Sequence, residues 1–226
     1  NNWNVVQYSI LTMMIAQVTG FKPGEFVHVI ADAHIYDRHV PAIREIIGRY
    51  DVAQVKGLKL IASSAQITMK RNSQANLEMQ LSGKAEVSTD GNAVLAAGIK
   101  AEEISLSPAG SSSLSVVGES KQLTVNASGT SKLSGNQKAE NATLKITNST
   151  DVTLSGTVES LEINADKNSE LDCGNFVARN ITATMNGGRA NVNAEEELSV
   201  SLTGGSVLNY SGTPVFKIGK VIKSTL

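Results

Sequence analysis

The chain has 226 residues and a formal charge of −1, from 20 Lys+Arg and 21 Asp+Glu. This balance excludes a general nucleic-acid-binding protein and a polybasic membrane-surface protein. The single cysteine, Cys173, excludes a disulfide framework and a thiolate zinc cluster. No apolar run reaches the roughly 18–20 residues that a membrane-spanning helix needs.

The composition changes near residue 50. All three histidines (His28, His34 and His39) and the only tryptophan precede residue 40, whereas most of the Gly- and Ser-rich sequence follows residue 50. We therefore expect two parts. Residues 1–50 form an incomplete fragment, and residues 51–226 form the main domain. No signal peptide is visible, because no basic region leads into a small-residue cleavage site.

The first part predicts a helix, a strand and a second helix. Residues 5–19 lack Gly and Pro and are apolar on almost every side, which is typical of a helix inside a larger protein. Residues 26–30 have the β-branched pattern of a strand, and residues 41–47 begin with proline as helices often do. The apolar helix could also cap an open end of a repeat structure.

This part resembles thymidylate synthase over about residues 3–47. The resemblance lies in residues 4–20 (NVVQYSILTMMIAQVTG), 22–26 (KPGEF) and 32–39 (DAHIYDRH). It implies that Asn4 contacts the pyrimidine ring of dUMP, and that His34 and Tyr36 hold the deoxyribose hydroxyl.

The resemblance omits the family's chemical machinery. The nucleophilic cysteine, the phosphate-binding arginines and the folate site of that family lie outside the matched stretch, and Cys173 stands in unrelated sequence. We therefore expect no thymidylate synthase activity, no catalytic residue, and a non-functional dUMP site at Asn4, His34 and Tyr36.

The second part repeats an apolar-x-apolar pair, a polar turn and another such pair. The first pairs start at residues 104, 123, 144, 161, 181 and 198, with spacings of 19, 21, 17, 20 and 17 residues. A period near 20 predicts a mainly β fold, a right-handed parallel β-helix (β-solenoid) with about 20-residue coils. An antiparallel β-sandwich is the alternative. In either fold Cys173 takes an inward position and is a small core residue.

This part resembles the auto-transporter adhesin head family, or head GIN domain, over about residues 52–220. The resemblance lies in residues 55–70 (VKGLKLIASSAQITMK) and 187–214 (GGRANVNAEEELSVSLTGGSVLNYSGTP). It implies a β-solenoid in the bacterial envelope and supplies no functional residues. Because the two families belong to different compartments, the chain reads as a chimera joined near residues 48–52.

Chemical motifs are sparse. The runs at residues 102–103 and 195–197 are adjacent glutamates before strands, and we interpret them as charged side chains exposed to solvent. Phe176, Tyr210 and Phe216 are the only aromatic residues after residue 50. The histidine spacings fit no zinc site. We expect no metal and no cofactor.

The function we expect is a non-catalytic surface module for adhesion or interaction, with a protein or glycan partner. It needs no nucleic acid and no transmembrane span, and its oligomeric state is open. The alternatives are a passive envelope spacer and a thymidylate-synthase-related protein that methylates dUMP. The expected location is the cell envelope or surface, or the cytoplasm if the first part decides it.

Overall fold

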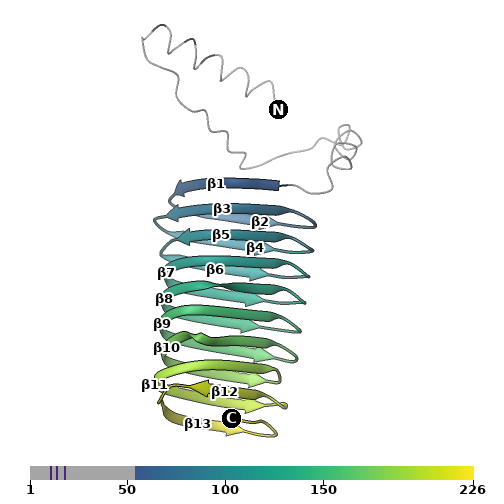
Figure 1. Ribbon diagram of the computed structural model, residues 1–226, viewed down its shortest axis with the longest axis vertical. Helices are drawn as coiled ribbons and strands as arrows, with labels where there is room; N and C mark the ends of the chain where they lie inside the picture. Colours follow the sequence, from purple (N-terminus) through teal and green to yellow (C-terminus); the bar gives the residue numbers. More distant parts are fainter. Residues whose placement is uncertain (1–10, 12–13, 15–17, 19–53) are drawn as a thin grey trace. The chain divides into compact units, whose positions relative to one another are not determined.

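The computed structural model describes residues 11, 14, 18 and 54–226 (Figure 1). Leu11, Met14 and Val18 are helical, as the sequence predicts for residues 5–19, and all three are exposed. The other residues of the predicted helix, strand and helix lie outside the described residues. The chain divides into two compact units, Asn1–Arg49 and Tyr50–Leu226. The two-domain assignment stays a prediction.

Thirteen strands of the second unit form a single sheet in which every pairing between strands is parallel. Figure 1 shows them stacked one above another from β1 to β13. The strands are β1 (Gln54–Ala62), β2 (Ala65–Met69), β3 (Gln74–Leu81), β4 (Lys84–Thr89), β5 (Val94–Lys100), β6 (Glu103–Pro108), β7 (Ser113–Ala127), β8 (Lys132–Ile146), β9 (Asp151–Asp166), β10 (Glu170–Asn186), β11 (Arg189–Thr203), β12 (Val207–Ser211) and β13 (Val215–Val221).

Each coil contributes to two faces. One face follows the order β1-β3-β5-β7-β8-β9-β10-β11-β12, and the other runs from β2 through β4 and β6 to the second halves of β7–β11 and then β13. The strands β7–β11 are long enough, at 15–17 residues, to bend and join both faces. The described chain is therefore a parallel β-solenoid of about nine coils spaced about 19 residues apart. The fold prediction is confirmed, and parallel pairing rules out the antiparallel sandwich.

The structure corrects one position in the predicted repeat. Leu123 pairs with Ala142, and Ala142 pairs with Leu161, so the third pair starts at Ala142 and not at Leu144. The corrected column is Ile104, Leu123, Ala142, Leu161, Ile181 and Leu198, with spacings of 19, 19, 19, 20 and 17. Alanine is apolar but small, and it is less conspicuous in a pattern of large apolar residues.

The core consists of inward columns that run along the stack. The pair at Leu144 and Ile163 is typical, since both side chains are fully buried and the flanking residues face outward. Burying a side chain of this size contributes roughly 1.5–3 kcal/mol, and a single coil could not exclude water from it without neighbours above and below. Cys173 has no exposed surface, as its inward position predicts.

Tight turns close the coils at one edge. The second residue of each turn takes a positive φ: Arg71, Gly91, Gly110, Gly129, Asn148, Lys167, Gly187, Gly204 and Lys223. The fourth residue of many turns is a buried Ser or Thr whose hydroxyl donates to the first residue's carbonyl. Such bonds join Ser112 to Ala109 (2.7 Å), Ser131 to Ser128 (2.8 Å), Thr150 to Thr147 (2.8 Å) and Ser206 to Thr203 (2.6 Å). The hydroxyl adds a hydrogen bond to the carbonyl at which the chain bends.

The turns yield a stability prediction. A Cβ at Gly129 (φ 78°) would lie 2.7 Å from the Gly110 carbonyl oxygen, so Gly129→Ala should cost more than the ~1–2 kcal/mol of a left-handed backbone alone. Lys167 holds the same position with φ 54°, and Lys167→Gly should leave the thermal midpoint unchanged or raised. Thermal unfolding followed by circular dichroism measures both. An unchanged midpoint for Gly129→Ala would contradict the turn assignment.

Candidate interaction groove

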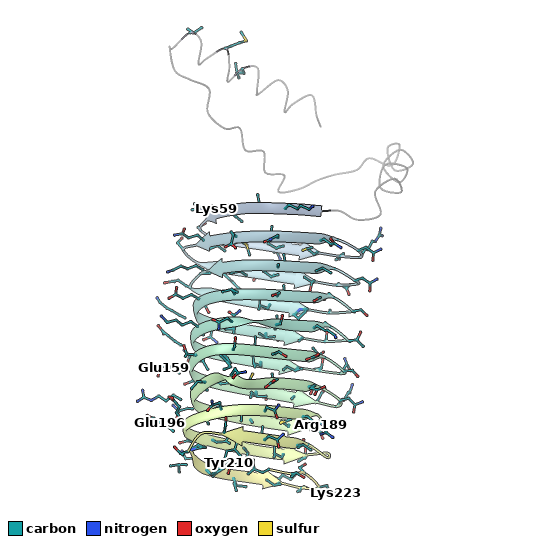
Figure 2. The ribbon with its side chains drawn as sticks, viewed as in Figure 1. Lys59, Glu159, Arg189, Glu196, Tyr210 and Lys223 are labelled. Atoms are coloured by element: carbon teal, nitrogen blue, oxygen red, sulfur yellow. The ribbon has the colours of Figure 1, made fainter. Side chains whose placement is uncertain are left out.

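A groove follows the edge opposite the turns, where the strands bend from one face to the other. Its volume is about 830 Å³. Figure 2 shows Glu159 and Glu196 at this edge, and Arg189 and Lys223 at the edge of the turns. We call it the edge groove. Its lining includes Lys100, Ala101, Glu102, Glu119, Ser120, Lys121, Lys138, Ala139, Glu140, Val158, Glu159, Arg179, Glu195 and Glu196.

Small side chains form the floor of the edge groove. Ala101, Ser120, Ala139 and Val158 follow one another on successive coils, because the preceding residues pair in register. The three apolar members are buried. The Ser120 hydroxyl oxygen is also buried and makes no hydrogen bond within the described part of the chain. Larger residues would fill the space that the bend leaves, so the small side chains keep the groove open.

Charged side chains on both sides of this floor alternate in sign from coil to coil. The order is Lys100 and Glu102 on one coil, Glu119 and Lys121 on the next, then Lys138 and Glu140. Glu119 lies 3.1 Å from the Lys100 ammonium and 3.6 Å from that of Lys138.

On the other side of the floor the alternation is interrupted once, because Glu140 and Glu159 are neighbours on adjacent coils. The Lys121 ammonium donates to Glu102 at 2.8 Å, and the Arg179 guanidinium bridges Glu159 (3.5 Å) and Glu196 (2.7 Å). If a coil paired with the next coil but one, like charges would lie beside each other. The alternation therefore favours the native register.

The ion pairs shift the pKa values of four side chains, Glu102, Glu119, Lys121 and Arg179. The Lys121 ammonium hydrogen-bonds Glu102 and lowers the pKa of that carboxyl, while Glu102 raises the pKa of Lys121. Lys100, followed by Lys138, lowers the pKa of Glu119. Glu196, followed by Glu159, raises the pKa of Arg179. Each of these four shifts favours the charged form, so the edge groove presents fixed charges of both signs.

The described residues offer few groups for metal binding or nucleophilic chemistry. Among residues 54–226 no group of three His, Cys, Asp or Glu side chains could hold a metal ion. The Cys173 thiol is fully buried, and its burial, followed by the charge of Asp172, raises its pKa. A thiol of this kind is protonated and inaccessible to a substrate.

The sequence-predicted residues have mixed outcomes. Asn4, His34 and Tyr36 lie outside the described residues. Glu102, Glu103, Glu195 and Glu196 are exposed, as predicted for solvated charge, whereas Glu197 is half-buried and pairs with Lys217. Sequence reasoning missed that Glu102 and Glu196 belong to ion-paired ladders along a groove. The sequence pattern that indicates these ladders is the change from Lys-x-Glu to Glu-x-Lys at a spacing of 19 residues.

No helix within the described ranges is long and apolar enough to cross a membrane.

The ladder predicts a weak dependence of stability on pH. Because the pKa of Glu119 is lowered, its carboxylate stabilises the fold fully above the ordinary carboxyl value of 4.5. This stabilisation is lost as the pH falls through the lowered pKa. Glu119→Gln should lower the thermal midpoint only slightly at pH 7, because exposed ion pairs contribute little to stability. The difference should vanish in acid and shrink in high salt.

Glu140→Gln is the matched control, because Glu140 lines the same groove and acts on Lys121 only beyond ion-pair distance among the residues described here. Equal effects of the two variants at pH 7 would show that the pairing of Glu119 contributes nothing.

Two family models match parts of the chain. The family model described as "Putative auto-transporter adhesin, head GIN domain" matches residues 97–214, and the model for thymidylate synthase matches residues 1–82. Both predicted resemblances are confirmed. The thymidylate synthase match extends beyond the expected residues 3–47 and includes β1, β2 and β3. No solved structure matches the chain.

The adhesin-head match covers more than half of the chain and contains the complete strands β7–β11 together with the edge-groove residues from Lys100 onward. The chain belongs to the auto-transporter adhesin head (GIN) domain family.

Proposed function

We propose that this chain is a non-catalytic module of the bacterial cell envelope or surface that binds a protein or glycan through the edge groove. Membership in the adhesin head family supports a surface setting. The parallel β-solenoid supports it as well, because stacked coils give an extended, rigid surface along which a ligand can lie.

The edge groove is the observation that carries this proposal. Strands lie about 4.8 Å apart in such a stack, so the charges of the groove repeat at fixed intervals over several coils. Fixed charges of both signs beside a floor of small residues suit a chain-like ligand with regularly spaced polar groups. A passive spacer would not need a groove, and it is the alternative that a binding experiment excludes.

An enzymatic role has less support. The thymidylate synthase match ends at residue 82, and the only cysteine, Cys173, is buried in the solenoid core. We propose that Asn4, His34 and Tyr36 form no functional dUMP site and that the chain does not methylate dUMP. Covalent addition to a pyrimidine needs an activated thiolate beside its substrate.

A binding experiment tests the proposal. The 226-residue chain is applied to arrays of glycans and of extended peptides, and retained ligands are titrated against two variants. The double variant Lys121→Gln/Arg179→Gln removes two cations from the edge groove, and we expect at least a tenfold loss of affinity. The control Lys132→Gln changes an exposed lysine outside the groove and should bind as the wild type does.

Circular dichroism confirms that both variants keep their strands. Absence of any retained ligand would favour the spacer, and equal losses in both variants would contradict the edge groove as the site. The same preparation is titrated with dUMP and assayed for conversion to dTMP. Saturable dUMP binding would overturn our account of the first part of the chain.

A further inference from the structure

Strand β13 has one open edge. It pairs with β11 along one side, and among residues 54–226 no strand pairs with its other side. The other strand of this coil differs, since Thr225 bridges to Val207 and accepts a hydrogen bond from the Leu208 amide at 3.0 Å. The backbone edge is therefore open along β13, whereas Thr225 covers the start of β12 at Val207 and Leu208.

The inward columns of the core are uncovered at this edge. Leu198, Val200 and Leu202 of β11 are buried, with 0–2% of their surface exposed. Their partners on β13 are Phe216, Ile218 and Val221, which are 36%, 60% and 39% exposed. One further strand in register would bury these side chains as β13 buries those of β11.

The charges of this coil have one sign. Residues 198–226 contain Lys217, Lys220 and Lys223 and no Asp or Glu. Lys217 forms an ion pair with Glu197 of the preceding coil at 2.6 Å. Where the edge groove forms ion pairs, cations on one coil meet carboxylates on the next. A strand that continued this rule beyond β13 would carry carboxylates.

A second copy of this chain does not fit the edge. The coil of β1 and β2, residues 54–73, contains Lys56, Lys59, Lys70 and Arg71 and no Asp or Glu. If the β1–β2 coil or the β13 coil of one copy stacked on either of these coils of another copy, cations would lie beside cations. Edge lysines are a common defence against such pairing. A chain with negative charge therefore fits the edge better than a second copy does.

We propose that the open edge of β13 binds an extended acidic peptide segment by strand addition, with apolar residues over Phe216 and Ile218 and a carboxylate beside Lys217. Main-chain hydrogen bonds supply affinity in this mode, and the alternating side chains supply specificity. The proposal is independent of the edge groove.

The solenoid itself provides the probe. Leu161, Glu162 and Ile163 of β9 occupy the same columns as Phe216, Lys217 and Ile218 of β13. A fluorescent peptide with the sequence of residues 159–166 (ESLEINAD) therefore has the required alternation. Its position 164 lies in the column of Lys220, so the peptide variant Asn164→Glu should bind more tightly.

Fluorescence anisotropy with the 226-residue chain measures the binding. We expect saturable binding that weakens at least tenfold with the chain variant Lys217→Gln/Lys220→Gln or with the peptide variant Glu162→Lys. Lys220→Gln alone gives a smaller loss without disturbing the pair between Lys217 and Glu197. Lys145→Gln is the matched control, because Lys145 is exposed in the same column as Lys220 and should bind like the wild type.

Three results would overturn the proposal. The first is no peptide binding, and the second is equal binding by the lysine variants and the control. The third is that the chain does not bind the peptide but sediments with phosphatidylglycerol vesicles. That result would assign the lysines and the apolar residues to binding of an anionic bilayer.

Discussion

The parallel register between coils is the constraint on which the rest of this structure depends. Because each residue pairs with its equivalent about 19 residues away, a single inward residue becomes a column and a single turn becomes an edge. Strand pairing alone leaves the register free to slip. Inward columns such as that of Leu144 and Ile163 oppose a slip by one residue, because it would expose the whole column. The tight turns add a second constraint by fixing where each coil bends.

The same register produces the surface that we assign to binding. Glu119 meets Lys100 and Lys138 only because the coils that carry them are neighbours in register. An exposed ion pair contributes little to stability, so these ladders are better understood as a patterned surface than as a source of stability. At β13 the pattern is incomplete, since its apolar columns and its lysines have no matching strand on the open side among the described residues. Both proposed sites thus follow from the same repeat. The edge groove lies where the strands bend, and the second site lies along the unpaired side of β13.

The sequence predicts the core better than the surface. Alternating apolar pairs identify the solenoid and place Cys173 inside, since burial acts directly on residue type. The third repeat is misassigned because Ala142 is a weak apolar signal beside Leu144. The sequence analysis misses the edge groove because glutamates such as Glu102 are solvated in either case, whether they stand in a simple charged run or form ion pairs with neighbouring coils. Only the pairing of distant coils distinguishes the two. The exposure of Ile218 likewise depends on which strands stack and not on its neighbours in sequence.

The most direct test of this account is the register itself, measured by engineered disulfides. Ser134 and Thr153 face outward on adjacent coils and pair in register, so Ser134→Cys/Thr153→Cys should form an intramolecular disulfide under mild oxidation. Ser115 pairs with Ser134 and is therefore two coils from Thr153, so Ser115→Cys/Thr153→Cys should stay reduced. Native Cys173 is buried and should not compete. Efficient crosslinking of the second pair and not the first would contradict the parallel solenoid.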